Sequence, residues 1–282
     1  MNTEIEEFLK TNPHIEYKLD ENDNLIYLDY SNTQISSLPN LSNLIHLKKI
    51  YCWNTNISYL PGIENCVNLK MLDCSHTNIL NLAGIENCIN LEYLNCANTN
   101  ISSLQDLSNL IHLIELYCYN TKISNLPGIE NCVNLNYLNC LNTNIDFNYK
   151  SDFNKPYIKF WQDKGLLPET NNGILFFKHT SSKLTGNMNF QYKINESFQN
   201  DGMACAGPFG TLQDYNLYPD DPRILVIEAT KICPVNLHKG IFHIYEGTPI
   251  CVYKANNITE SGADLVLEQG KEPKELLKIF ER

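Results

Sequence analysis

The sequence predicts an α/β solenoid built on a parallel sheet, followed by a small α+β C-terminal domain. Three observations lead to this prediction. A 22-residue unit is written six times between residues 25 and 145 without an insertion, and a fixed period in this range is typical of a solenoid. The pattern stops after Ile145. From Gly173 onward the chain consists of separate short β-forming runs, which favour a second, compact domain.

A threonine marks the same position in every unit, and an isoleucine follows two places later. The threonines are Thr33, Thr55, Thr77, Thr99, Thr121 and Thr143. The unit reads L-x2-L-x-C-x2-T-x-I-x2-L-x2-I-x2-C-x2, which resembles the 22-residue class of leucine-rich repeats over nearly half of the chain. The resemblance implies that L-x2-L-x-C is a short strand with Leu and Cys pointing inward, and that all the strands form one curved parallel sheet on the concave side.

The threonine replaces an asparagine that this family usually carries. A hydroxyl offers one donor and two acceptors, so we expect it to bond neighbouring turns, though less fully than an amide. On the convex side, Pro61-Gly62 and Pro127-Gly128 indicate turns, and the segment I-E-N-C-[VI]-N is expected to form a short helical turn.

Composition excludes several classes of protein. The net charge is −11 and no Lys/Arg run interrupts it, so neither nucleic acid nor an anionic membrane surface is an expected partner. No apolar run reaches membrane-spanning length, and the N-terminus MNTEIEEFLK is acidic where a secretory signal is basic and then apolar. We therefore expect a cytoplasmic protein.

Eight of the eleven cysteines occupy fixed positions of the unit. They are Cys52, Cys74, Cys96, Cys118 and Cys140 in the strand, and Cys66, Cys88 and Cys132 at the end of the unit. Leucine fills the latter position in other units, so we interpret these thiols as small buried hydrophobic groups. Stacked thiols favour a reducing compartment. Short C-x2-C or Cys/His pairs are absent, and no metal site is predicted.

The chain resembles the leucine-rich-repeat proteins of giant DNA viruses of amoebae in two respects. Its repeats contain the motifs N-T-N-I and C-x-N-T, and Asn, Ile, Tyr and Lys are abundant. This resemblance implies a host-cytoplasmic location. The segment FFKHTSSKLTGNMNFQYKINESF is similar to an uncharacterised domain found beside repeats in giant-virus proteins and related bacterial ones. That family implies no activity for this chain.

The predicted domains follow from these patterns. Residues 1–23 form an N-terminal cap, in which Thr3 and Glu6 indicate a capping box and a short helix over the first coil. Residues 24–148 form the solenoid. Residues 149–172 form a closing segment and linker, with Phe147 and Phe153 expected over the last coil and a helical turn at 159–167. Residues 173–282 form the C-terminal domain.

Within that domain we predict six strands and one helix. The strands are 174–178, 190–194, 224–229, 241–245, 250–253 and 265–267, with Gly247 at a hairpin turn between the fourth and the fifth. Pro273 then opens a final amphipathic helix over 274–280.

No catalytic motif is present in the sequence. Cys205, in the loop MACAGPFG, is the best candidate nucleophile, because small residues permit close substrate approach. His243 and Cys251 are interpreted as packing residues of successive strands. The spacing of Asp214, Asp220 and Asp221 is not that of a calcium loop. We predict no catalytic residue, no cofactor and no enzyme activity.

A copied block places aromatic residues on the predicted concave face. Residues 41–74 align with 107–140 at 25 of 34 positions. The predicted partner-binding residues are Tyr27, Tyr51, Trp53, Met71, Tyr93, Tyr117, Tyr119 and Tyr137. Such rings form a protein-binding strip, or they are good strand formers that stack on one another.

We predict a binding protein that holds a protein partner on this face. The sequence indicates neither the identity of the partner nor the oligomeric state of the chain. The alternative is an effector enzyme whose repeats recruit a substrate for the C-terminal domain.

Overall fold

The computed structural model describes residues 3–148, 150–151, 153–164, 166–180, 195, 197–206, 223–236, 241–259, 262–271 and 273–276. The chain divides into two compact units, Met1–Asp146 and Phe147–Arg282.

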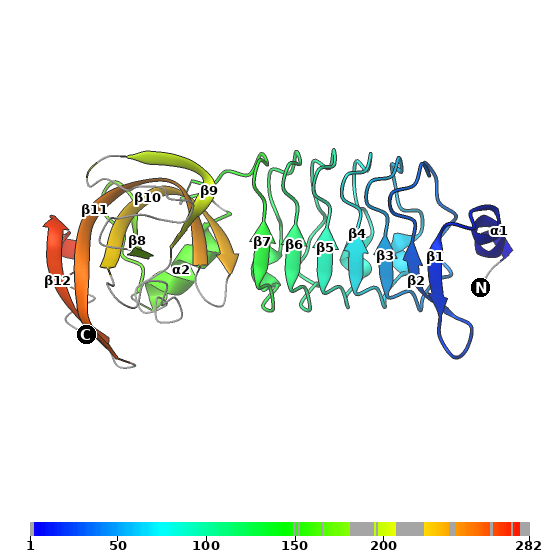
Figure 1. Ribbon diagram of the computed structural model, residues 1–282, viewed down its shortest axis with the longest axis horizontal. Coiled ribbons are helices and arrows are strands. Elements are labelled where there is room, and N and C mark those ends of the chain that lie inside the picture. The colour runs from blue at the N-terminus through cyan, green and yellow to red at the C-terminus, as the bar shows by residue number, and fades with distance from the viewer. Residues whose placement is uncertain are drawn as a thin grey trace. The chain divides into compact units, whose positions relative to one another are not determined.

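Unit 1 is a solenoid whose strands lie side by side in chain order (Figure 1). They are β2 (Leu25–Asp29), β3 (Lys49–Tyr51), β4 (Met71–Asp73), β5 (Tyr93–Asn95), β6 (Glu115–Tyr117) and β7 (Tyr137–Asn139). Each pairs in parallel with the next at a shift of one unit, so Leu72 lies opposite Leu94 and Leu94 opposite Leu116. These central residues are fully buried. The predicted parallel solenoid is confirmed.

Helix α1 (Thr3–Thr11) and one further strand precede the first parallel strand, β2. Ile5 and Leu9 are the buried residues of the helix, as expected for a cap. Strand β1 (Glu16–Leu19) pairs antiparallel with β2, and this strand was not predicted. All four of its side chains are exposed, so it shows none of the alternation between buried and exposed residues that identifies a strand in a sequence.

The repeated threonine closes its own coil and does not bond a neighbouring one, which corrects our expectation. Its hydroxyl donates to the carbonyl three residues earlier, as Thr99 does to Cys96 at 2.7 Å. Asparagines one place earlier make the contacts between coils. Asn120 Nδ2 donates to Asn98 Oδ1 at 2.8 Å, and His76 replaces asparagine in this row. These residues have φ near 55°, a left-handed conformation in which Asn is enriched.

The predicted helical turns are 3-10 helices: η1 (Ile63–Asn65), η2 (Ile85–Asn87) and η3 (Ile129–Asn131). Each follows a glycine with positive φ, such as Gly84 at φ 98°. A Cβ at Gly84 would lie 2.7 Å from the Cβ of Glu64 in the preceding coil. Glycine is therefore required here both by the backbone conformation and by the close approach of two coils.

The eight repeat cysteines are buried and are not joined in disulfides, which confirms their interpretation as small buried hydrophobic groups. Burial raises the pKa of Cys66, Cys88, Cys96 and Cys132 to about 12. Tyr30 takes the cysteine position in the first unit and is 1% exposed. Tyr30 therefore precedes Cys52, Cys74, Cys96, Cys118 and Cys140 at the same position of the unit.

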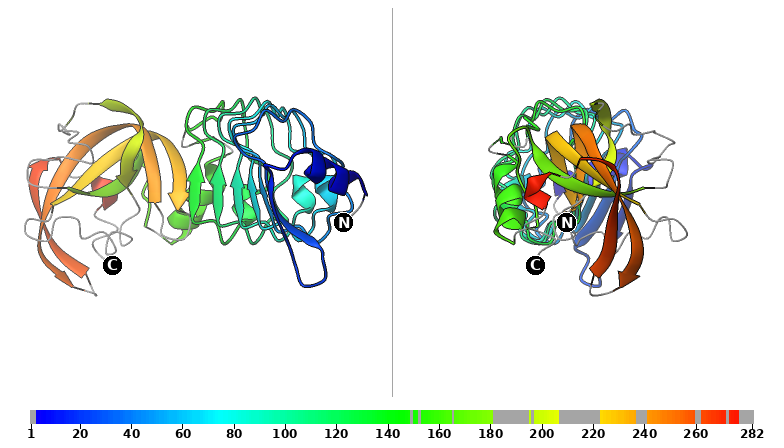
Figure 2. Two further views of the ribbon diagram at one scale, coloured as in Figure 1. Left: turned by 45° about the vertical axis from the view of Figure 1, so that its right-hand side comes forward. Right: turned by 90° about the vertical axis from the view of Figure 1, so that its left-hand side faces the viewer.

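Unit 2 is built on a five-stranded antiparallel sheet. Its strands are β8 (Ile174–Thr180), β9 (Phe198–Ala206), β10 (Arg223–Asn236), β11 (Ile241–Thr259) and β12 (Gly262–Gly270). Four of them follow the order β12-β11-β10-β8, and β9 also pairs with β11. Figures 1 and 2 show that β10 and β11 are long and strongly curved. Phe176 and Phe242 are buried against each other, with ring centroids 5.0 Å apart.

Several expectations for this domain are wrong. Gly247 is not a hairpin turn, because β11 runs through it and pairs it with Ala229 and Phe198. A Cβ at Gly247 would lie 2.8 Å from Ile227 Cγ2, so a close approach between strands selects glycine here. His243 and Cys251 consequently belong to one strand. Cys205 lies in strand β9, opposite His243, rather than in a loop.

Other expectations lie partly outside the described residues. The predicted strand at 190–194 and the acids Asp214, Asp220 and Asp221 fall outside them, as does the final helix beyond residue 276. Residues 274–276 are helical.

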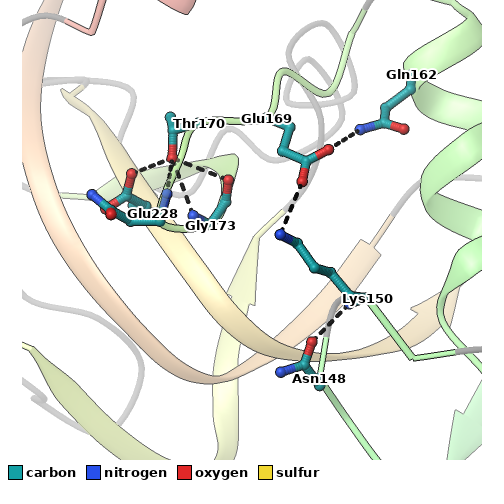
Figure 3. A network of polar contacts seen from close by, with 8 residues as sticks. Asn148, Lys150, Gln162, Glu169, Thr170, Gly173 and Glu228 are labelled. Carbon is teal, nitrogen blue, oxygen red and sulfur yellow. Dashed lines mark hydrogen bonds and ion pairs between the residues drawn. The ribbon is translucent and has the colours of Figure 1, made fainter.

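Helix α2 (Lys155–Asp163) begins before the predicted turn at 159–167. Phe153 packs within unit 2, with its ring 6.2 Å from Phe147 and 6.1 Å from Tyr157. Figure 3 shows polar contacts among residues before, within and after this helix. Thr170 Oγ1 bonds both Gly173 and Glu228, so the closing segment is tied to the sheet.

Candidate protein-binding face

The solvent-facing side chains of β2–β7 form two rows, which we call the strand face. In register, the first row is Tyr27, Lys49, Met71, Tyr93, Glu115 and Tyr137, and the second is Asp29, Tyr51, Asp73, Asn95, Tyr117 and Asn139. The buried central residue of each strand separates the two rows. Six of the eight predicted binding residues therefore belong to one continuous surface.

The aromatic residues of the strand face form two clusters. The rings of Tyr27 and Tyr51 are 5.8 Å apart, and Tyr51 Oη lies 3.5 Å from the Met71 sulfur. In the second cluster, the Tyr117 ring lies 5.6 Å from Tyr93 and 5.0 Å from Tyr137. These are favourable separations for aromatic pairs. The rings thus pack against one another in tilted pairs, at interplanar angles of 50°, 44° and 35°, and they remain half-buried or exposed. Ring-to-ring packing is what one of our two interpretations expected.

Trp53 and Tyr119 lie two residues beyond the ends of β3 and β6, and so at the exits of the strands rather than within them. Trp53 is 37% exposed. The two rings come from coils that are three units apart, with the buried Ser75 and Ala97 at the same position between them. Strands in a sheet are about 4.8 Å apart, so these rings do not join into one patch.

Acidic side chains accompany both clusters. Tyr27 Oη donates to Asp29 Oδ2 at 3.1 Å, and Tyr117 Oη donates to Glu115 Oε2 at 2.9 Å. Burial, and then the nearby carboxylates, raise the pKa of Tyr27 to about 12 and move the pKa of Tyr117 in the same direction. Both hydroxyls are therefore protonated donors at neutral pH.

The carboxylates of the strand face lack ionic partners among the described residues. The ion pairs found there join Lys70 to Glu92 at 2.6 Å and Lys150 to Glu169 at 3.7 Å. Asp29, Asp73 and Glu115 belong to neither pair. The face thus combines aromatic rings with carboxylates that form no ion pair among the described residues, although Lys49 lies in its first row.

A second exposed row escaped the sequence analysis. Five β-branched residues precede the strands at intervals of one unit and are 41–57% exposed. They are Ile45, Val67, Ile89, Ile111 and Val133. The backbone carbonyls of Ile45, Val67 and Ile111 accept a hydrogen bond from an asparagine of the next coil, for example where Asn90 Nδ2 donates to Val67 O at 3.0 Å. The 22-residue spacing of these five residues is visible in the sequence. The buried leucines have the same spacing, so the period alone does not show that this row is exposed.

A polar hollow of about 400 Å³ lies beside the asparagine and threonine rows. His76 contributes to its lining, and its Nε2 is 3.1 Å from Asn98 Nδ2. No group of three or more His, Cys, Asp or Glu side chains in the described part of the chain is arranged to hold a metal ion. Within the same residues, no helix is long and apolar enough to cross a bilayer.

Comparisons with known proteins agree with the repeat pattern. Residues 67–109 match the family model described as leucine-rich repeats in two copies. Comparison with curated protein sequences gave no match.

The solved structures that resemble the chain include two bacterial leucine-rich-repeat proteins. Internalin InlF of Listeria monocytogenes is 23% identical over 45% of this chain and 36% of its own, with a TM-score of 0.40. YopM of Yersinia enterocolitica is 24% identical over 43% of this chain and 30% of its own, with a TM-score of 0.35. The chain thus spans less than half the length of either protein. Unit 1 is a leucine-rich-repeat solenoid, by its coil geometry and by the family match.

Proposed function

We propose that this chain is a non-catalytic binding protein that holds a protein partner on its strand face, the predicted concave side of the solenoid. The binding residues are those predicted from the sequence: Tyr27, Tyr51, Trp53, Met71, Tyr93, Tyr117, Tyr119 and Tyr137. Leucine-rich-repeat solenoids in general mediate protein–protein interactions through such extended surfaces.

The cluster formed by Tyr93, Tyr117 and Tyr137 is the observation that carries this proposal. Its rings already pack against one another in tilted pairs, so binding a partner costs little further side-chain entropy. Tyrosine is also enriched among the residues that dominate interface energies. The buried thiols support a reducing compartment, and we place the protein in the cytoplasm on that basis.

A photo-cross-linking residue at Tyr137 tests the proposed surface. Tyr137 is 37% exposed on β7, whereas Tyr59 is 53% exposed outside the strands. We expect the residue at position 137 to cross-link a partner protein in extracts of the source cells, and the same residue at position 59 to give no such product. A variant with Tyr117 and Tyr93 changed to Ala should lose the product from position 137.

The exposed β-branched row is the alternative binding surface, and the same cross-linking experiment tests it. If position 89 cross-links the partner and position 137 does not, binding occurs at the turns before the strands and the proposal is wrong. Equal products from positions 59 and 137 would likewise contradict a defined binding face.

A further inference from the structure

Strands β4–β7 carry negative charge and aromatic rings but no basic residue. Their twelve positions include Asp73 and Glu115 and no Lys or Arg. Glu115 lies in register between Tyr93 and Tyr137, and it accepts the hydroxyl of Tyr117. A carboxylate among ring faces is the combination that attracts a cation from two directions, through charge and through the ring quadrupole.

The chain itself shows the cation–π part of this interaction at the other cluster. Lys18 lies opposite Tyr27 in the pairing of β1 with β2. Its ammonium is 5.0 Å from the centroid of the Tyr27 ring, and the same ring donates through its hydroxyl to Asp29. The first cluster therefore has a cation supplied by β1. The second cluster has the same three groups, with the carboxylate two residues before its tyrosine rather than two residues after it. Among the described residues, no cation–π contact is made to this cluster.

We propose that the cluster of Tyr93, Tyr117, Tyr137 and Glu115 binds arginine side chains of a basic protein segment. The guanidinium stacks on the tyrosine rings and donates to the Glu115 carboxylate. This inference rests on the proposed function, because it names the chemistry of the partner for the same face.

Arginine fits these groups better than other occupants. Its planar guanidinium stacks on aromatic rings and donates to a carboxylate at the same time. An acidic segment would bring like charge to Glu115 and Asp73, in a chain whose net charge is −11. A purely apolar segment would bury the Glu115 carboxylate with the Tyr117 hydroxyl but without a cationic partner, which is costly.

Peptide binding to the full chain tests the proposal. The probe is a fluorescein-labelled decapeptide of alternating arginine and serine, followed by fluorescence anisotropy at low salt. We expect binding that weakens about fivefold in Glu115→Gln, since one charged contact in a partly exposed site has about this effect. Tyr117→Ala should weaken binding by at least as much. The citrulline version of the peptide, which has the same shape without charge, should not bind.

Glu130→Gln is the matched control, because Glu130 lies in the same coil as Glu115 but on the 3-10 turn. It removes the same charge and should leave the affinity unchanged. Equal weakening by both variants would mean attraction by net charge alone and would overturn the proposal. Absence of arginine-peptide binding would overturn it as well. Unchanged thermal unfolding of each variant shows that folding is not the cause.

Lys18 provides a second measurement. Lys18→Met removes the cation from the Tyr27 ring, so the first cluster should become available and the arginine peptide should bind at a second site. Lys122→Met, an equal change of charge at an exposed position outside the strands, should not create that site.

If position 137 cross-links a partner while Glu115→Gln has no effect on arginine binding, the face binds proteins without recognising cations. That result separates failure of this inference from failure of the proposed function.

Discussion

A single hydroxyl closes each coil of the solenoid. In the four central units the threonine is buried, and its Oγ1 lies 2.7 Å from the carbonyl that it bonds. The side chain satisfies a carbonyl that the turn leaves without a backbone partner, and it does so within its own coil. The asparagine row one place earlier bonds between coils instead, and no β-branched residue would adopt its left-handed backbone readily.

Thr99→Val tests the value of this hydroxyl. The substitution keeps the shape and removes the donor, so the carbonyl of Cys96 is left unsatisfied in the core. We expect the free energy of unfolding to fall by about 2 kcal/mol, measured by urea denaturation. Thr33→Val removes the same 2.7 Å bond from a half-buried position. Water can replace that bond, and the loss should be clearly smaller; equal losses would show that burial does not set the cost.

At the scale of the element, a strand of three residues buries only its central side chain. Much of the core therefore comes from residues outside the strands, such as Leu69 and Leu91 in the turns that precede them. The β-branched row stands two places before these leucines and is exposed. Both rows have the same 22-residue period and the same apolar character. Only the direction in which the turn points each side chain distinguishes them.

Substitutions two residues apart should therefore differ widely in cost. Leu91 is fully buried and Ile89 is 50% exposed. Leu91→Ala should destabilise the protein by about 3 kcal/mol, whereas Ile89→Ser should change stability by less than about 0.5 kcal/mol. Thermal and urea unfolding of the two variants provide the comparison. A large cost at position 89 would mean that this row is covered in the folded protein.

At the scale of the whole molecule, two units are stabilised in different ways. Unit 1 repeats local contacts between neighbouring coils, whereas unit 2 depends on pairings of distant segments, such as β8 with β10. The thiols of unit 1 have a summed effect on stability. Burial raises the pKa of each thiol whose pKa shift is resolved.

The raised pKa values of the buried thiols predict that the protein loses stability at alkaline pH. The pKa of Cys66, Cys88, Cys96 and Cys132 rises from 9.0 to about 12 on folding. The fold thus favours the neutral thiol. Its contribution is fully present below pH 9 and is lost as the pH rises toward 12. Each of the four thiols should cost on the order of 1 kcal/mol at pH 10 relative to pH 7.

Urea unfolding at the two pH values, in the presence of a reductant, measures this loss. The double variant Cys88→Val and Cys132→Val should lose less stability between pH 7 and pH 10 than the native chain does. An identical pH dependence in both proteins would assign the alkaline loss to groups other than these thiols.

The sequence by itself determined the solenoid, the register of its strands, the 3-10 turns and the burial of the cysteines, because a strict repeat makes every contact a copy of its neighbour. The tertiary structure decided the rest. Thr99 bonds its own coil and Gly247 lies inside a strand, because the first depends on the geometry of a turn and the second on the pairing of distant strands. The hydrogen bond from Tyr117 to Glu115 depends on the side-chain conformations within the strand face. A periodic sequence fixes which positions are equivalent, whereas the packing of particular side chains decides what each position does.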